Sequence, residues 1–433
     1  MRHRRRMVNW LLAVGVISTA PPLAAAQAGR PTGRWAGVAT LPRQGSFRIE
    51  ITLDSTASGW QGTLLIPSQS PQPIPFDSIG RVKDSLILQL PARAQNAVFR
   101  IALSPDGQQL GGVVIAAVNG TLVAARPGTP VAATIMAPVQ RIDDSRAAAN
   151  RLAGSTSPAA KPGANPDSAR LVTSDIKLFW SAVDRAPPDS LAEYLQHEYL
   201  EKASVGVRDF IRGRIMSAED LAQHVRDHRA TYDSVRAANL DVTRADAAIR
   251  AAFHKLKDLY PDAVFPDVYF VIGRFNSGGT SSDHGLLIGA EMYRDPASLP
   301  AIVSHELIHY QQHYENQKLL EHSFLEGTAD FVGEMISAKH INNAAHQYGM
   351  AHEAELWAEF SKHFDDTNFF PWMYGKPPDG KPNDLGYFIG YRIAHAYYDK
   401  AADKKQAIRD IITARGGNVR ELLAMSRYAG SGR

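Results

Sequence analysis

The stretch with the clearest chemical potential runs from Ser304 to Tyr310. It contains His305, Glu306 and His309 in the spacing His-Glu-x-x-His. Residues four apart share one face of a helix, so both histidines can direct a ring nitrogen at one ion. Zinc suits them, because it binds imidazole and keeps an open position in catalytic sites. Glu306 lies about 100° further around the helix, where it can act as general base on a zinc-activated water.

A chance match on a structural helix is the competing interpretation. The composition gives such a match odds of roughly a few in a hundred. Pro300 stands where a helix can begin, and Ile302, Leu307 and Ile308 make the surrounding turns apolar. Two histidines and a glutamate buried there would be costly without partners. A metal ion supplies the partner, so we favour a metal site with one zinc per chain.

A catalytic zinc usually takes three protein ligands. His313 lies one turn past His309, but about 12 Å of helix separates it from the first histidine of the pattern. Glu315 would point about 240° away from His309 on a continuing helix. The segment between His309 and Glu326 is long enough for the first helix to end and for a second helix to run back beside it. We therefore expect Glu326 to be the third zinc ligand. Asp330, one turn later, is expected to accept the outer N–H of a ligand histidine. A surface pair of acids is the alternative for these last two residues.

Two apolar β-type runs precede the predicted metal helix, Pro266–Arg274 and Gly285–Ala290. We expect them to form a small sheet against that helix. An exposed edge of this sheet could bind an extended peptide by strand addition. We assign Gly278 and Gly279, in the loop between the runs, to substrate binding. An ordinary connection is an equally weighted interpretation of that loop.

Peptide hydrolysis also needs a donor to the oxyanion that develops on the scissile carbonyl. Tyr391 is our candidate, with Tyr387 and His395 as rivals on one predicted helix after Asp384. The competing interpretation for each is a core aromatic residue of a closing helix.

The N-terminus has the features of a targeting segment. Four of the first six residues are arginine, an apolar run follows from Trp10 to Thr19, and Leu23–Ala28 offers small-residue cleavage sites. This predicts a secretory signal peptide over residues 1–28, with export to the periplasm or the extracellular medium. The apolar run is too short to span a bilayer comfortably, and no later stretch could, so we expect no membrane span in the mature protein.

Composition narrows the possible partners. The chain of 433 residues has a formal net charge of +3, and the N-terminal arginines account for this excess, so the mature chain is close to neutral. Such a balance indicates no nucleic-acid partner. The chain has no cysteine, which excludes disulfides and thiolate chemistry. The sequence indicates no particular oligomeric state.

The patterning predicts a multi-domain α+β protein. Residues 29–127 contain about eight short β-type runs separated by turns, as expected for a small antiparallel β-barrel or sandwich. We interpret it as an accessory domain, with a ligand-binding barrel as the alternative. Residues 128–168 are rich in Ala, Pro, Gly and Ser and predict a flexible linker with a short helix around Asp143–Leu152. Residues 169–433 are mostly helical in pattern and form the predicted zincin-like metallopeptidase domain.

The pattern His-Glu-x-x-His followed by Glu326-x-x-x-Asp330 resembles the gluzincin metallopeptidases. More narrowly, residues from about Val268 to His395 resemble a family of proposed zinc-dependent peptidases among exported bacterial proteins. The matching stretches are the His-Glu-x-x-His helix, Gly273–Thr280, Gly285–Glu291, Glu326–Asp330 and Gly386–Tyr391. The resemblance implies zinc peptidase activity on a peptide or protein substrate.

Gly289-Ala290-Glu291-Met292 is also similar to a signature of M1 aminopeptidases. That similarity implies recognition of a substrate's N-terminal amine by Glu291. We therefore predict a secreted zinc-dependent peptidase, with an aminopeptidase-type exopeptidase as one alternative. A non-peptidase zinc hydrolase and a catalytically inactive zincin-like binding or scaffold protein are the others. The intact Glu306 argues against the inactive protein, because a pure metal-binding fold does not need the base.

Overall fold

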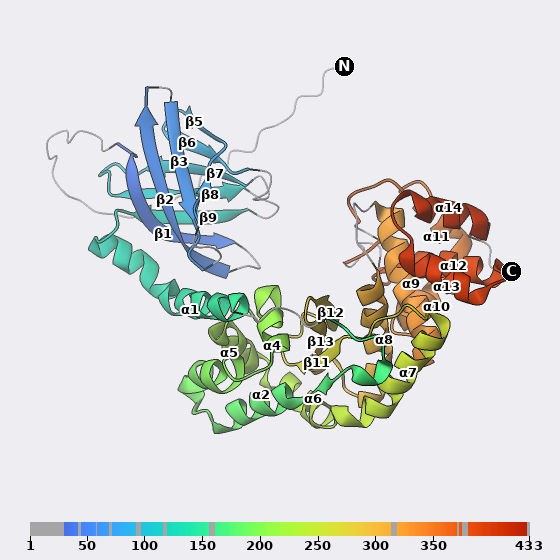
Figure 1. The fold of residues 1–433 in the computed structure, drawn as a ribbon. Coiled ribbons are helices and arrows are strands. Elements are labelled where there is room, and N and C mark those ends of the chain that lie inside the picture. The colour runs from blue at the N-terminus through green and yellow to red at the C-terminus, as the bar shows by residue number, and fades with distance from the viewer. Residues whose placement is uncertain are drawn as a thin grey trace, which may run out of the picture. The chain divides into compact units, whose positions relative to one another are not determined.

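The structure is a computed structural model that describes residues 30–41, 45–57, 59–68, 72–91, 97–115, 119–155, 161–312, 318–369, 372–374 and 380–430. The predicted signal peptide lies outside these residues. The described part of the chain falls into two compact units, one up to residue 138 without residues 67–71, and one containing those residues and everything from Val139. Each unit has its own hydrophobic core (Figure 1).

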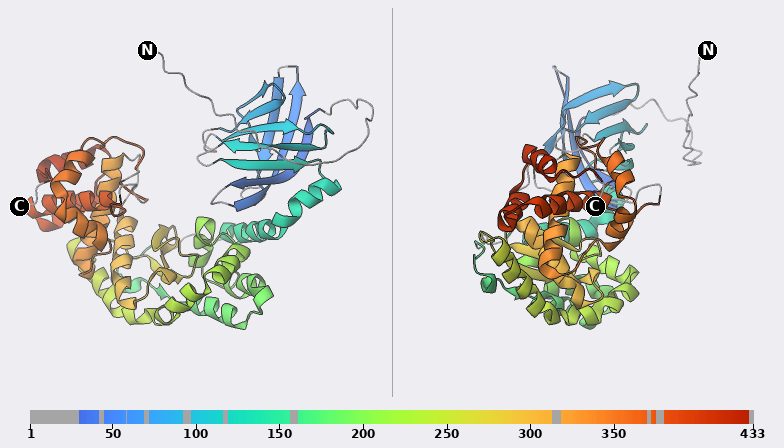
Figure 2. Two further views of the ribbon diagram at one scale, coloured as in Figure 1. Left: turned by 180° about the vertical axis from the view of Figure 1, so that it is seen from behind. Right: turned by 90° about the vertical axis from the view of Figure 1, so that its right-hand side faces the viewer.

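The first unit is a single antiparallel sheet in the order β4-β3-β2-β1-β9-β8-β7-β6-β5. Its strands are β1 (Gly33–Leu41), β2 (Gly45–Thr56), β3 (Gly59–Leu65), β4 (Ile74–Pro75), β5 (Ser78–Val82), β6 (Ser85–Gln89), β7 (Val98–Leu103), β8 (Gln109–Ile115) and β9 (Gly120–Ala125). Alternate residues of β2, such as Ile49, Ile51 and Leu53, are buried with Trp35. The sheet curls around this core into a half-barrel, seen from two further sides in Figure 2. The predicted antiparallel β-domain is confirmed.

Most of the segment expected to be a flexible linker is helical in the structure. Helix α1 (Pro130–Gly154) occupies most of residues 128–168, and Thr129 Oγ1 accepts from the backbone N–H of Ala132 near its start. Alanine-rich composition favours a helix as readily as a linker. Arg146 of this helix forms a buried two-pronged ion pair with Asp220, at 2.7 and 2.8 Å. This pair attaches the second half of α1 to the second unit, so the boundaries of the domains stay a prediction.

The second unit is mostly helical. Its helices before the sheet are η2 (Pro166–Ser168), α2 (Ser174–Arg185), η3 (Pro188–Ser190), α3 (Leu191–Tyr194), η4 (Leu195–Leu200), α4 (Val205–Phe210), η5 (Ile211–Ile215), α5 (Ala218–Asp227), α6 (Arg229–Leu240), η6 (Val242–Ala245) and α7 (Asp246–Leu259). Those after it are η7 (Ala290–Met292), η8 (Pro296–Ser298), α8 (Leu299–Gln311), α9 (Leu319–Ser337), α10 (Asn343–Ala351), α11 (Glu353–Phe360), α12 (Leu385–Lys400), α13 (Lys404–Thr413) and α14 (Gly417–Ser426). No helix in the described ranges combines the length and the apolar character needed to cross a membrane.

A four-stranded sheet, ordered β10-β11-β13-β12, lies in this unit. The two predicted β runs are present as β11 (Asp267–Val271) and β13 (Gly285–Gly289), which pair in parallel with each other. The short β10 (Leu171–Val172) pairs in parallel with β11 on its other side. The connection between β11 and β13 contains a strand that the sequence analysis did not predict, β12 (Gly279–Ser282). Glycine and serine have low β propensity, and pairing with β13 overrides it. Strand β12 forms one edge of the sheet.

Helix α8 packs against strand β12 and against α9, and α12 packs on α9. Glycines let the backbones approach closely. A Cβ added at Gly390 of α12 would lie 1.7 Å from the carbonyl oxygen of Ser323 on α9, and one at Gly333 of α9 would lie 3.2 Å from the backbone nitrogen of His305 on α8. The two glycines therefore set the spacing of the three helices that surround the candidate site.

Candidate metal centre

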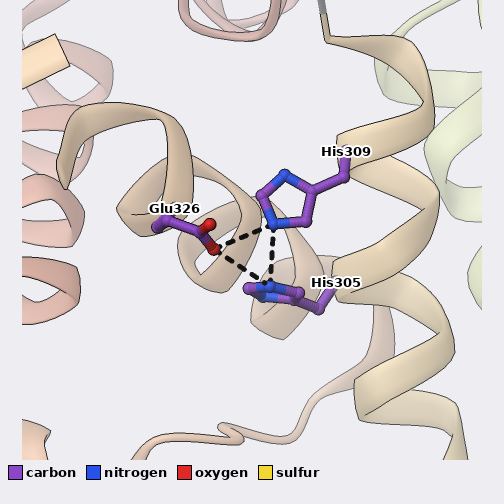
Figure 3. A group of neighbouring side chains, drawn as sticks. All are labelled: His305, His309 and Glu326. Atoms are coloured by element: carbon purple, nitrogen blue, oxygen red, sulfur yellow. Dashed lines mark hydrogen bonds and ion pairs between the residues drawn. The ribbon is translucent and has the colours of Figure 1, made fainter. Parts of the chain in front are cut away.

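Three side chains from two helices converge between α8 and α9 (Figure 3). The Nε2 atoms of His305 and His309 are 2.9 Å apart. Glu326 Oε2 lies 2.9 Å from the His309 Nε2 and 3.5 Å from the His305 Nε2. All three residues are buried, and no other group of three metal-binding side chains meets within the described ranges. Two nitrogens and an oxygen held around one tetrahedral zinc would lie about 3.3 Å apart, which matches this spacing.

The hydrogen-bond partners of the Nδ1 atoms of the two histidines determine whether their Nε2 atoms can bind a metal. His305 Nδ1 lies 2.8 Å from Asp330 Oδ1, and His309 Nδ1 lies 2.8 Å from Gln312 Oε1. The Gln312 amide is oriented by its N–H group, which donates to the carbonyl oxygen of Leu325. Because carboxylate and amide oxygens are acceptors, each Nδ1 carries the proton and each Nε2 presents a lone pair. Three acceptor atoms thus face one another, and they fit a cation.

In the metal-free cluster, protons occupy part of the space between these atoms. Burial raises the pKa of Glu326, but the charge of His309 and the hydrogen bond with His305 outweigh it and hold that pKa well below its usual value. Burial lowers the pKa of His305, yet its contacts with Asp330 and Glu326 hold the pKa well above the ordinary value. Since a proton and a metal compete for the same lone pairs, metal binding to this cluster releases protons.

Asp330 is buried beneath the cluster, as expected for a residue that orients a ligand. Its Oδ2 accepts a hydrogen bond of 2.6 Å from the side-chain amide of Asn342, which leaves Oδ1 directed at His305. The structure therefore brings together four of the predicted site residues on α8 and α9. The rival ligands His313 and Glu315 lie outside the described residues.

Glu306 faces the edge strand rather than the other acids. A Cβ added at Gly279 of β12 would lie 2.5 Å from Glu306 Oε1, so only glycine lets the strand pass this close. Burial raises the pKa of Glu306, and the neighbouring His305 and His309 partly offset this. A carboxylate with a raised pKa beside an open strand edge is suited to proton transfer. The neighbouring Gly278 lies against the hydroxyl of Tyr293.

Glu291 has a different environment from the one predicted. It is fully buried, and its Oε1 accepts a hydrogen bond of 3.3 Å from the backbone N–H of Phe275. Burial raises its pKa to about 7. A carboxylate without solvent exposure is poorly placed to meet the amine of a substrate, so its burial argues against the predicted substrate binding by Glu291. The similarity to the aminopeptidase signature contains no information on burial.

The hydroxyl nearest to the cluster is not the predicted one. Tyr391 donates to Glu334 at 2.8 Å, so its hydroxyl is engaged with a residue other than the three ligands. Of its rivals, Tyr387 stacks on His305 with ring centroids 6.3 Å apart, and His395 lies 3.4 Å from Asp399. The role of Tyr391 as the oxyanion donor therefore stays a prediction without a contact to the three ligands among the described hydrogen bonds.

Tyr374 reaches the cluster instead. Its hydroxyl donates to Glu326 Oε1 at 2.9 Å and lies 2.5 Å from His322 Nε2. Its backbone is in the left-handed region, with φ of 62°, and its N–H donates to the side chain of Asp384. Sequence reasoning missed this residue because it lies between helices, where no periodicity marks it. Its one signal is the aromatic run Phe369-Phe370-Pro371-Trp372 just before it.

Two family models match parts of the second unit. Residues 168–342 match the model for gliding motility protein GldB, and residues 274–413 match the model described as a predicted Zn-dependent protease (DUF2268). The second match contains all three converging side chains and Glu306. No curated protein and no solved structure matches the chain. The protein is thus similar, over this region, to a family of predicted zinc proteases, and the whole β-rich unit lies outside both matches.

Proposed function

We propose that this protein is an exported zinc-dependent peptidase of the gluzincin type, in which His305, His309 and Glu326 hold zinc and Glu306 is the general base. The observation that carries the proposal is the convergence of three buried acceptor atoms beside a carboxylate that touches an edge strand. The match to predicted Zn-dependent proteases supports it.

In the proposed hydrolysis, each of these residues has a separate role. Zinc, when bound, would polarise the scissile carbonyl and lower the pKa of a water toward about 7. Glu306 takes the proton of the attacking water and delivers it to the leaving amine. Asp330 and Gln312 keep the two histidines in the tautomer that binds metal. Tyr374 is our revised donor to the developing oxyanion, because its hydroxyl already lies at Glu326.

Strand β12 is the proposed binding site for the peptide substrate. It pairs with β13 on one side and stands at the edge of the four-stranded sheet. A peptide in extended conformation can pair with such an edge through its backbone, with little regard to sequence. The contact between Gly279 and Glu306 would then bring a scissile bond next to the base.

This arrangement favours an endopeptidase over an aminopeptidase. The buried Glu291 removes the residue on which recognition of a free N-terminus depended. Export stays part of the proposal, supported by the N-terminal sequence and by the match to the GldB family, whose model name marks a lipoprotein domain.

The test is cleavage of a mixed peptide library by the wild type and by Glu306→Gln. The variant keeps all three metal ligands and the volume of the side chain, so it should bind zinc and fold normally. We expect hydrolysis to fall on the order of 10²–10⁴-fold, the usual contribution of a general base. Chelation of the wild type should abolish cleavage, and added zinc should restore it. A Glu306→Gln protein that cleaves at the wild-type rate would exclude Glu306 as the base.

A further inference from the structure

Arg214 belongs to η5, where non-helical backbone at Arg212 and Gly213 turns the segment into a loop beside the substrate edge. The loop contains two residues in the left-handed region, Gly213 with φ of 74° and Met216 with φ of 71°. The carbonyl oxygen of Arg214 accepts hydrogen bonds from Arg274 Nε at 2.8 Å and from Asn276 Nδ2 at 3.1 Å. Two side chains from the connection that leads into β12 thus hold this backbone in place.

The guanidinium of Arg214, by contrast, has only weak partners. It lies 3.4 Å from the hydroxyl oxygens of Ser277 and Thr280, both neutral groups at the long limit of hydrogen bonding. It also lies over the ring of Phe210, at 5.8 Å. Among the described residues no carboxylate forms an ion pair with it, although the side chain is partly buried. The loop is therefore held through its backbone, and the charged group remains available.

The position of Arg214 relative to Glu306 follows from the alternation of side chains along strand β12. Successive side chains of a strand point to opposite faces of the sheet. Gly279 faces Glu306, whereas Thr280, the next residue, contacts Arg214. The base and the arginine therefore flank the edge strand on its two faces. An extended peptide on this edge alternates in the same way, with every second side chain on the face of Arg214.

We infer that Arg214 forms a carboxylate-binding subsite that selects acidic peptides, an inference that rests on the proposed function. Guanidinium binds carboxylates through two parallel hydrogen bonds, which the present hydroxyl contacts do not supply. The carboxylate can come from an Asp or Glu side chain of the substrate or from its free C-terminus. Both sources present the same group, and the peptides chosen for the test separate them.

The test uses binding, so that it does not depend on turnover. Zinc-loaded Glu306→Gln protein is titrated with three fluorescent peptides of one length. One carries a central Glu and an amidated C-terminus, the second carries Gln and a free C-terminus, and the third carries Gln and an amide. We expect one or both anionic peptides to bind more tightly than the neutral one, on the order of 10-fold or more for a charge-assisted hydrogen bond.

Adding Arg214→Gln should remove this preference. Adding Arg214→Glu should reverse it toward a fourth peptide, which carries a central Lys and an amidated C-terminus. Arg212→Gln is the matched control, because Arg212 is an exposed neighbour with the same charge, and it should retain the preference. Equal binding of all three peptides, or a preference that survives Arg214→Gln, overturns the subsite. A preference without cleavage by the wild type would instead contradict the proposed peptidase and leave the subsite standing.

Discussion

At the scale of single residues, the contact between Gly279 and Glu306 connects substrate binding to catalysis. A Cβ at position 279 would lie 2.5–2.8 Å from the carboxyl group and Cγ of Glu306. Burial raises the pKa of the base, and the strand in contact with the base is the one proposed to bind substrate. The position of this strand therefore bears directly on the position of the Glu306 carboxyl group.

Gly279→Ala should lower kcat without loss of zinc. The added methyl group displaces the carboxyl group of Glu306, and misplacing a catalytic group by about 1 Å can cost 10²-fold in rate. The three metal ligands do not touch position 279, so zinc content should stay at the wild-type level. Ser281→Ala, an exposed change on the same strand, is the control and should be neutral. Normal kcat in Gly279→Ala would show that the position of Glu306 does not depend on β12.

Helical spacing explains why part of the site could be predicted. His305 and His309 share a face, as do Glu326 and Asp330, because each pair is four residues apart on a helix. Tyr374 could not be predicted in this way, since its approach to Glu326 depends on a loop conformation that leaves no repeating pattern. For Glu291 the residue type was chemically suitable, but its burial is a property of the tertiary structure.

At the scale of elements, the metal centre depends on how closely α8, α9 and α12 pack. The sequence indicates these helices by their apolar character, and their type was predicted. The distances between them depend on glycines at particular positions. Strand β12 could not be predicted for a similar reason, because its conformation depends on pairing with β13. Helix α1 lies where the alanine-rich composition is compatible with both a helix and a linker.

Gly390→Ala should destabilise the second unit and weaken zinc binding together. The methyl group would lie 1.7 Å from the backbone of α9, so α12 must move or α9 must shift with Glu326. Overpacking of this kind typically costs 1–3 kcal/mol. Gly417→Ala is the control, since a Cβ there meets nothing within 4 Å. Urea denaturation and zinc titration of both variants measure the effects, and a Gly390→Ala protein with wild-type values would contradict this packing argument.

At the scale of the whole molecule, all the proposed chemistry belongs to the second unit. The three metal ligands, the base, the edge strand and Arg214 come from residues beyond Val139, and this unit has its own core. The half-barrel of the first unit has a separate core around Trp35. We therefore propose that the second unit is an autonomous catalytic domain, with the β-rich unit as an accessory domain.

A chain of residues 139–433 should fold and bind one zinc per molecule. It retains Arg146 and Asp220, whose ion pair holds the remaining part of α1. Cooperative thermal unfolding, zinc content and peptide cleavage should match those of the full-length protein. An insoluble or metal-free fragment would mean that the β-rich unit is needed for the fold of the catalytic unit.

The most direct test of the account is zinc affinity after substitution of the proposed third ligand. Glu326→Ala removes one of three converging donor atoms and should lower zinc affinity sharply, whereas His313→Ala and Glu315→Ala should bind zinc like the wild type. Asp330→Ala should give a loss on the order of 10–100-fold, as expected for a residue that orients a ligand. Competition titration against a chelator of known affinity measures all four variants. Wild-type affinity in Glu326→Ala, together with a loss in His313→Ala or Glu315→Ala, would contradict the proposed metal centre and the gluzincin assignment.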